Sequence, residues 1–288
     1  MAKLLCFLLA CLAAQASAVT VVDDRGAHVT LTQAPQRIVT LLPSLAETVC
    51  MLDACNRLVG TDKHANWPTQ VKALPKLGGL DDTSLEALVR LKPDLVLLAK
   101  SSRHINRMES LGLKVLALEP QNMADVKRVN LTVARALQLP EADSKAEQLW
   151  QHALQGIAKA QQQVPSMAVG ASVYFEASTG GYAAGEASFI GEVMKQMGLK
   201  NIVPIGMGAF PQLNPEFVVR ANPQVILLGE PMATQLHQRP GWARMQAVQQ
   251  HHVCTFTPAE GDVLVRPGPR LGEAAQLIAS CLQKHFHP

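Results

Sequence analysis

The residues that could carry metal chemistry are few and widely spread along the chain. Beyond residue 18 the cysteines are Cys50, Cys55, Cys254 and Cys281. No CxxC pair or neighbouring histidine gives them zinc-type spacing. His251 and His252 are adjacent, and His285 and His287 lie near the end of the chain, but neither pair has a carboxylate or cysteine partner beside it. Such pairs are more typical of a solvated surface than of a metal centre.

Sequence signatures of enzymes are also missing. There is no G-x-S-x-G nucleophile elbow, no HExxH zinc motif and no G-x-x-x-x-G-K-[ST] phosphate loop. The pair Gly206 and Gly208 lacks the third glycine of a dinucleotide fingerprint. A secreted hydrolase or metal enzyme therefore stays only the minor alternative to a binding protein.

The charge distribution excludes another class of partner. The chain of 288 residues carries 26 basic and 23 acidic residues, a formal net charge of +3, and no block of five lysines or arginines. A nucleic-acid-binding surface needs a concentrated basic patch. We therefore expect no nucleic-acid partner.

The first residues have the pattern of an export signal. Lys3 precedes an apolar run from residue 4 to 14, and the small residues Ala16-Ser17-Ala18 follow it. This pattern predicts a signal peptide over residues 1–18 and a cleaved, exported, periplasmic protein. A weaker alternative is lipidation at Cys11, because Leu8-Leu9-Ala10-Cys11 loosely matches a lipobox.

An oxidising compartment permits disulfides among the remaining cysteines. Cys50 and Cys55 are five positions apart near an expected helix end, so a small disulfide loop is plausible. The competing interpretation is that they are small buried hydrophobic residues. The spacing of Cys254 and Cys281 does not decide whether they are bonded.

The elements that must position any site alternate between strand and helix in the first half. Residues 19–22 and 28–31 predict a hairpin, and 37–42 predict a buried strand. Ser44 and Glu47 have the spacing of a capping box at the start of a helix that runs toward Cys55. Further strands are expected at 58–61, 95–99 and 115–118, and helices at 85–91 and 123–137. This alternation predicts a mostly parallel sheet.

The second half repeats this texture after one long helix. Residues 140–164 are rich in Ala, Gln, Glu, Lys and Leu and contain no internal proline, which favours a continuous helix. Strands are then expected at 171–175, 225–228 and 253–256, and a closing helix at 271–285. We expect four segments: the signal peptide 1–18, an N-terminal lobe 19–139, a bridging helix 140–165 and a C-terminal lobe 166–288.

An internal repeat relates the two lobes. The segment from Ser84 to Leu98 aligns with the segment from Asn214 to Leu228 at a fixed offset of 130 residues. Glu, Val, Arg, Pro and a Leu-Leu pair recur in both. Each segment predicts a capped helix, a proline break and a buried strand, so a duplicated lobe is expected.

Several motifs resemble the periplasmic binding proteins of ABC importers for cobalamin, iron-siderophores and haem, most closely the cobalamin-binding members. The motifs are RIVTLLPSLAE from Arg37, LVGT from Leu58, Trp67-Pro68, LGG from Leu77, LKPDLV from Leu91, GEASFI from Gly185, and the segments 210–216 and 266–272. The resemblance implies an α/β fold of two Rossmann-like lobes bridged by one long helix, a class III periplasmic binding protein. It also implies a monomer that binds a cargo, has no intrinsic cofactor, catalyses nothing and delivers its cargo to a permease dimer in the inner membrane.

The resemblance also places a ligand cleft. The residues that it assigns to the cleft are His64, Trp67 and Leu80 in the first lobe and Tyr182, Phe210, Asp262 and Arg266 in the second. His64 and Leu80 stand where the cobalamin protein has aromatic residues, which weakens the case for cobalamin against haem or a ferric siderophore. The remaining aromatic faces still suit a flat macrocycle. His64 is either a polar loop residue or an axial ligand to the cargo metal.

Two carboxylates are expected on the permease-facing surface. Glu86 and Glu216 occupy the same position of the internal repeat, in the first turn of its helix. Helix capping alone explains a glutamate at either position. The resemblance implies that both pair with arginines of the permease. A rigid bridging helix further predicts that the lobes move little when cargo binds.

Overall fold

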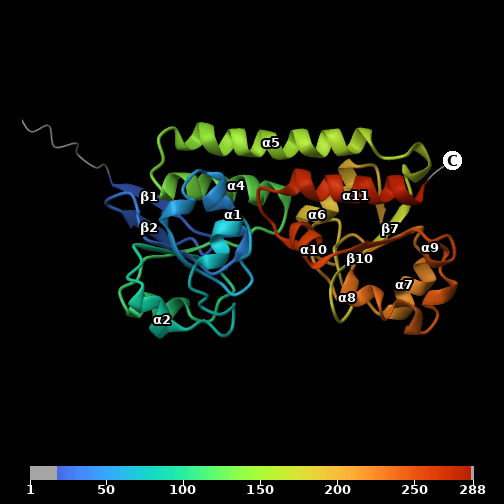
Figure 1. The fold of residues 1–288 in the computed structure, drawn as a ribbon, viewed down its shortest axis with the longest axis horizontal. Helices are drawn as coiled ribbons and strands as arrows, with labels where there is room; N and C mark the ends of the chain where they lie inside the picture. Colours follow the sequence, from blue (N-terminus) through green and yellow to red (C-terminus); the bar gives the residue numbers. More distant parts are fainter. Residues whose placement is uncertain (1–17, 287–288) are drawn as a thin grey trace, which may run out of the picture.

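The structure is a computed structural model that describes residues 18–286. Two sheets lie side by side beneath the long helix α5 (Ala142–Gln162), which spans both of them (Figure 1). We call the part built on the first sheet the N-lobe and the part built on the second sheet the C-lobe. The predicted two-lobed α/β fold is thus confirmed. Residues 1–17 of the expected signal peptide, which include the lipobox at Cys11, and also His287 lie outside the described residues.

The N-lobe sheet is parallel and buried. Its strands are β3 (Ile38–Thr40), β4 (Leu58–Thr61), β5 (Leu95–Leu98) and β6 (Val115–Ala117), in the order β4-β3-β5-β6. Every residue of β3, β5 and β6 is buried, as expected of strands covered on both faces. Its helices are α1 (Pro43–Met51), α2 (Leu85–Arg90), α3 (Ile105–Ser110) and α4 (Met123–Ala136). The predicted hairpin forms from β1 (Val19–Val22) and β2 (His28–Leu31).

The C-lobe sheet has the order β11-β10-β7-β8, and β9 also pairs with β7. Its strands are β7 (Ser172–Ser178), β8 (Tyr182–Ala183), β9 (Lys200–Asn201), β10 (Val225–Gly229) and β11 (Val253–Phe256). The helices are α6 (Phe189–Gln196), α7 (Pro215–Ala221), α8 (Glu230–Ala233), α9 (Gln246–Gln249), α10 (Pro258–Val265) and α11 (Leu271–His285). Short 3₁₀ turns occupy Cys55–Arg57, Thr69–Ala73, Ser166–Ala168, Leu236–Gln238 and Trp242–Arg244.

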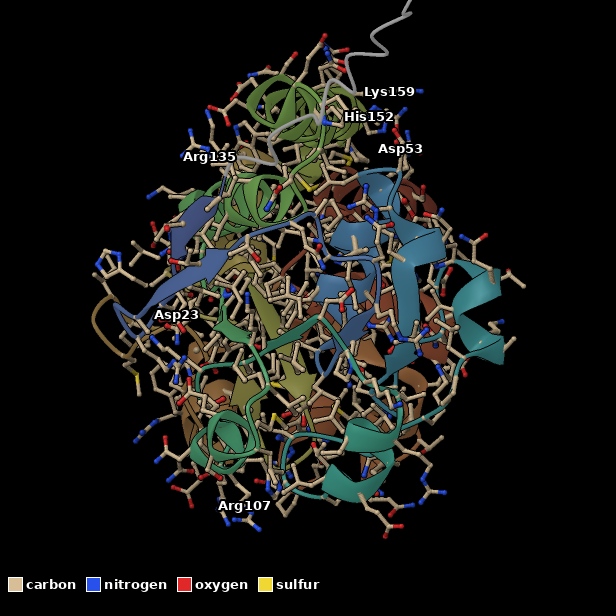
Figure 2. The ribbon with its side chains drawn as sticks, turned by 90° about the vertical axis from the view of Figure 1, so that its left-hand side faces the viewer. Asp23, Asp53, Arg107, Arg135, His152 and Lys159 are labelled. Carbon is tan, nitrogen blue, oxygen red and sulfur yellow. A yellow bond between two sulfur atoms is a disulfide. The ribbon has the colours of Figure 1, made fainter. Side chains whose placement is uncertain are left out.

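Helix α5 joins the lobes because its apolar stripe packs on a helix of each lobe. Leu149, Trp150, Ala153 and Ile157 recur at helical spacing and are buried against α4 and α11. At the crossing with α11, a Cβ on Gly156 would lie 2.6 Å from the Cα of Gly272, so only glycine permits this approach. Seen from the N-lobe end, α5 with His152 and Lys159 lies at the edge opposite Arg107 of α3 (Figure 2).

The predicted repeat is present as a structural unit in both lobes. Helix α2 leads into β5 and helix α7 leads into β10, and each strand is an interior strand of its sheet. Lys92 and Asn222, which are related by the repeat, share a φ of +46° directly before a proline. Shared backbone conformation at related positions supports duplication rather than coincidence.

One local prediction at the start of α1 is wrong. The Ser44–Glu47 pair does not form a capping box, because the helix begins at Pro43 after Leu42, which makes no side-chain cap. Both Ser44 and Glu47 are buried within the helix. A capping glutamate must reach back to its own helix terminus, whereas the Glu47 carboxylate instead contacts Arg266 of the C-lobe.

The four cysteines of the described chain form two disulfides. Cys50, near the end of α1, is joined to Cys55, and Cys254 of β11 is joined to Cys281 of α11. The first bond closes the turn between α1 and β4. The second fastens the closing helix to the C-lobe sheet.

Candidate functional site

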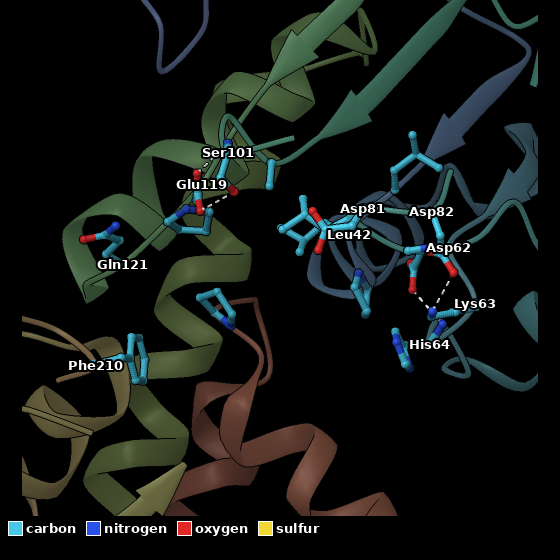
Figure 3. A pocket seen from close by; sticks show the side chains of 17 residues that line it. Leu42, Asp62, Lys63, His64, Asp81, Asp82, Ser101, Glu119, Gln121 and Phe210 are labelled. Atoms are coloured by element: carbon cyan, nitrogen blue, oxygen red, sulfur yellow. Dashed lines mark hydrogen bonds and ion pairs between the residues drawn. The ribbon is translucent and has the colours of Figure 1, made fainter. Parts of the chain in front are cut away.

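A cavity of about 660 Å³ lies between the lobes (Figure 3). Its lining comes mostly from N-lobe loops that follow strands, and Phe210 and Pro267 face them from the C-lobe. The lining residues are Leu41, Leu42, Pro43, Asp62, Lys63, His64, Gly79, Leu80, Asp81, Asp82, Ala99, Ser101, Glu119, Pro120, Gln121, Phe210 and Pro267. A cavity of this size suits a small-molecule ligand.

The polar wall is built at the carboxyl ends of parallel strands. Asp62 follows β4 directly, Ser101 follows β5, and Glu119 follows β6. Because parallel strands end at one edge of the sheet, all three residues lie along that edge, with Ser101 and Glu119 together and Asp62 at the far end, beyond β3 and β5. The backbone N–H and the hydroxyl of Ser101 donate to the Glu119 carboxylate at 3.0 and 2.9 Å. The wall therefore presents fixed hydrogen-bonding groups toward the cavity.

Asp62 shapes the loop that carries His64. One oxygen of its carboxylate accepts hydrogen bonds from the backbone N–H groups of His64 and Ala65, at 2.7 and 3.0 Å. The other oxygen is buried without a hydrogen-bond partner. Burial raises the pKa of Asp62 above its usual value, against the opposing effect of the hydrogen bond from His64. The side chain thus holds the His64 loop in place at the cavity wall.

A second carboxylate, that of Asp82, organises the neighbouring 79–82 loop. The Asp82 carboxylate accepts from the backbone N–H of Gly79 at 2.5 Å and from the Lys63 ammonium at 2.9 Å. These contacts, that with Lys63 foremost, hold the pKa of Asp82 below its usual value. Asp82 therefore ties the 79–82 loop to the His64 loop on the same wall.

The C-lobe wall is apolar. Phe210 is 37% exposed and rests on Phe189 of α6 with ring centroids 5.8 Å apart. The loop before it contains Gly206 and Gly208 at positive φ and the exposed Ile205. In Figure 3 the Phe210 ring lies across the cavity from His64, Asp62 and Asp82. The C-lobe side of the cavity is thus apolar, and all the ionisable lining side chains lie on the N-lobe side, which we call the polar wall.

The structure divides the residues that the sequence assigned to the cleft. His64, Leu80 and Phe210 line the cavity, and Trp67, Tyr182, Asp262 and Arg266 are not among its lining residues. The Arg270 guanidinium lies over the Trp67 ring, with its central carbon 4.3 Å from the ring centroid. Tyr182 is 44% exposed at the end of the C-lobe sheet, where it bridges to Gln212.

Arg266 joins the two lobes instead of forming a free polar wall. Its guanidinium, on the C-lobe, donates to the Glu47 carboxylate at 2.7 Å and to the Asn66 side-chain oxygen at 2.9 Å. It also donates to the main-chain oxygen of His64 at 2.9 Å and pairs with Asp262 at 2.8 Å. We call Glu47, Asn66, Asp262, Arg266 and Arg270 the interlobe cluster.

The central ion pair of the interlobe cluster, Glu47 with Arg266, is buried. Glu47 is 1% exposed and Arg266 is 7% exposed. Burial raises the pKa of Glu47 above its usual value, although Arg266 and Arg270 favour the charged form. Sequence reasoning missed Glu47 and Asn66 as functional neighbours. The available signal was a lone carboxylate in a helix whose other residues are all uncharged and mostly buried.

The two predicted docking glutamates are not among the residues that line the cavity. Glu86 and Glu216 are exposed in the first turns of α2 and α7. Helices α2 and α7 lie on the side of the molecule opposite α5, one in each lobe (Figure 1). Ser84 and Asn214 cap these helices with their own side chains, so neither glutamate is needed as the N-cap.

Within residues 18–286 no cluster of three or more His, Cys, Asp or Glu side chains could hold a metal ion. His64 as an axial ligand would therefore be a single protein ligand to a metal that arrives with its cargo. No helix of the described residues is long and apolar enough to cross a membrane.

Comparison of the sequence with known proteins identifies the family of this chain. The model of the family described as "Periplasmic binding protein" matches residues 38–260. An uncharacterised ABC transporter substrate-binding lipoprotein of Bacillus subtilis is 28% identical, with 92% of this chain and 85% of that protein covered. A cobalamin-binding protein of Halobacterium salinarum is 30% identical over 73% of this chain and 58% of its own length.

Solved structures show the same fold. The periplasmic vitamin B12 binding protein of Vibrio cholerae has a TM-score of 0.70 at 22% identity, with 88% of this chain and 98% of that chain covered. The periplasmic haem-binding protein of Roseiflexus sp. RS-1 has a TM-score of 0.73 at 23% identity, with 87% and 98% covered. With two lobes, a spanning helix and a cavity between them, the chain belongs to the periplasmic binding protein family of ABC transporter substrate-binding proteins.

Proposed function

We propose that this chain is the periplasmic component of an ABC importer that captures a corrinoid, such as cobalamin, between its lobes and delivers it to a permease dimer. The observation that carries the proposal is the two-faced cavity, with Phe210 on one wall and hydrogen-bonding side chains on the other. A corrinoid has the matching character, because its ring is a broad apolar face and its rim carries amide groups. The cobalamin-binding relative supports the same cargo.

The cavity supports binding rather than catalysis. Its lining hydroxyl, on Ser101, donates to the Glu119 carboxylate instead of facing a histidine base. A nucleophilic serine needs such a base within hydrogen-bond reach. The cargo metal is part of the ligand, so the protein supplies binding groups and needs no cofactor of its own.

The haem alternative rests on one specific feature. His64 lines the polar wall, and an imidazole there suits the iron of haem as well as the cobalt of a corrinoid. The haem-binding neighbour has the same fold. A ferric siderophore remains the third candidate of this fold.

Delivery requires contact with the membrane component. Glu86 and Glu216 are proposed to dock a monomer of this protein onto the two permease subunits, because both are exposed on the side opposite α5. Export to the periplasm after cleavage at Ala18 is part of the proposal. The two disulfides support an oxidising compartment.

A titration of residues 19–288 with cyanocobalamin and, separately, with haemin tests the cargo. We expect saturable binding of one cyanocobalamin per protein by calorimetry, and recovery of a corrinoid by native mass spectrometry after expression in a corrinoid-producing host. Binding of haemin with a shifted Soret band, together with no heat from cyanocobalamin, would replace the corrinoid with haem. Binding of neither compound would reject a macrocyclic cargo.

A further inference from the structure

The charge of the cavity is distributed unevenly between its walls. Every ionisable lining side chain comes from the N-lobe, and four of them are carboxylates against the single ammonium of Lys63. The carboxylates belong to Asp62, Asp81, Asp82 and Glu119. Such an excess of one sign in a cleft focuses the electric field on whatever enters it. The polar wall is therefore acidic as well as hydrogen-bonding.

Two of the four carboxylates form an ion pair with a lysine or an arginine. Asp82 pairs with Lys63 at 2.9 Å, so these two charges largely cancel. The Asp81 carboxylate lies 3.6 Å from the Arg103 guanidinium, and both side chains are well exposed to solvent. Solvent screening makes such exposed pairs weak. Neither carboxylate gives the wall a strong uncompensated charge.

Glu119 differs because neutral groups hold it. Both of its carboxylate oxygens accept from Ser101, one from the backbone N–H and one from the hydroxyl. No ion pair involving Glu119 occurs in the part of the chain that the structure describes. Figure 3 shows Glu119 and Ser101 together on the wall that faces the cavity. Glu119 therefore presents an uncompensated negative charge, fixed in position by its partners.

Asp62 contributes less to ligand selection than Glu119 does. It is 1% exposed, and its one oxygen without a hydrogen-bond partner among the described residues is buried, so a ligand in the cavity does not contact that oxygen. Glu119 is therefore the carboxylate of this cavity that favours a ligand that donates hydrogen bonds.

We propose that this wall, through Glu119 above all, selects metal-chelate macrocycles by the charge of their rim: it accepts a rim of amides or cations and rejects a rim of carboxylates. The inference rests on the proposed function, since it concerns the cargo of the same cavity. An amide donates its N–H to a carboxylate of the protein. A carboxylate on the ligand can only accept, so it repels Glu119 and leaves both groups without a donor.

The chemical consequence separates the candidate cargoes. Cobalamin carries amides on its corrin rim, whereas haem carries two propionate carboxylates. The wall therefore favours the corrinoid, and Glu119 is the residue that we expect to determine this specificity. Leu80 and Phe210 supply apolar contact to either macrocycle and do not discriminate between them by charge.

A matched pair of ligands isolates this effect. Cyanocobalamin is compared with its monocarboxylic acids, which differ by hydrolysis of one peripheral amide, at pH 7.5 and low salt. We expect at least one of these acids to bind about tenfold more weakly or worse, since like charges are brought together in a cleft. Raising the salt concentration should narrow the difference.

A second pair keeps the test independent of the corrinoid cargo. Haemin is compared with its diamide, in which both propionates are amidated, and we expect the diamide to bind more tightly. The variant Glu119→Gln should remove most of the discrimination in both ligand pairs. Glutamine can accept from the Ser101 backbone N–H with its oxygen and donate to the Ser101 hydroxyl with its amide nitrogen, but it carries no charge. The control Glu147→Gln, on the exposed face of α5, makes the same chemical change away from the cavity and should leave the discrimination intact.

The outcomes distinguish a failure of the charge selection by Glu119 from a failure of the proposed corrinoid cargo. Equal affinity for cyanocobalamin and all of its acids overturns the inference about Glu119 and leaves the corrinoid function standing. A difference that persists unchanged in Glu119→Gln also overturns it. Haemin binding at least as tightly as its diamide overturns the inference even if no corrinoid binds. Failure of cyanocobalamin alone, with the diamide preferred over haemin, rejects the corrinoid cargo and supports the charge selection.

Discussion

Replacing Arg266 with alanine should destabilise the protein far more than removal of an exposed arginine. The Arg266 guanidinium makes four polar contacts of 2.7–2.9 Å, and its partners are drawn from both lobes. Removal would leave the Glu47 carboxylate, which is 1% exposed, with only the Arg270 guanidinium, 3.5 Å away. Both the lost contacts and the stranded carboxylate lower stability.

The magnitude follows from the burial of the pair. Breaking a buried ion pair by removing one partner costs about 3–5 kcal/mol, mostly because the remaining charge is left uncompensated. The weaker contact with Arg270 places the expected loss near the lower end, about 3 kcal/mol. The double variant Glu47→Met with Arg266→Met removes both charges, so it should recover a substantial part of the loss.

Urea unfolding followed by circular dichroism and by tryptophan fluorescence measures these changes. The control is Arg135→Ala, because Arg135 pairs with Asp143 between α4 and α5 where both side chains are about half exposed or more. Solvent screening makes the loss there much smaller. If Arg266→Ala lowers the free energy of unfolding no more than Arg135→Ala does, the interlobe cluster does not hold the lobes together and our reasoning is refuted.

Three further predictions concern binding, docking and shape. Phe210→Ala should weaken cargo binding by about 1–3 kcal/mol, because aromatic contact with the cargo is lost. The control Met167→Ala changes an exposed residue outside the cavity lining and should leave the affinity unchanged. If calorimetry gives Phe210→Ala the same affinity as the unchanged protein, Phe210 is not part of the site. The double reversal Glu86→Lys with Glu216→Lys should abolish uptake at unchanged cargo affinity, and the reversal Asp143→Lys with Glu147→Lys on α5 should not; uptake that survives the first pair leaves the glutamates as helix-terminal charges only. Small-angle scattering should show nearly the same radius of gyration with and without cargo, because α5 packs on both lobes and the interlobe cluster bridges them; a clear contraction on binding would contradict this.

The arrangement of strands and helices could be predicted because its signals are local. Short apolar runs predicted the buried strands β5 and β10, and a proline-free stretch of good helix formers predicted helix α5. The repeat was readable because the same residue types recur at a fixed offset of 130 residues. The structure adds the same backbone φ at the related positions Lys92 and Asn222. None of these features depends on a distant partner.

The site was less predictable because its contacts join distant residues. The S-x-x-E spacing at Ser44 and Glu47 fits a capping box, and nothing local in the sequence distinguishes that role from a contact with the other lobe. Only the hydrogen bond from Arg266, 219 residues away, shows that Glu47 faces the C-lobe. Arg266 was expected to face the ligand because the resemblance assigned it to the cleft, and its contacts with Glu47 and Asn66 join residues too distant in sequence to be foreseen. Glu119 had a usable signal that we did not exploit, since it follows a buried strand at the carboxyl edge of a parallel sheet.

A crystal structure of residues 19–288 grown with cyanocobalamin tests the central claim most directly. We expect the corrin between Phe210 of the C-lobe and the loops that carry His64 and Leu80, with its amide rim toward Glu119. Helix α5 should be unbent and the Glu47–Arg266 contact intact. Corrin density bound elsewhere, or an empty cavity at saturating ligand, would contradict the claim that the space between the lobes is the cargo site.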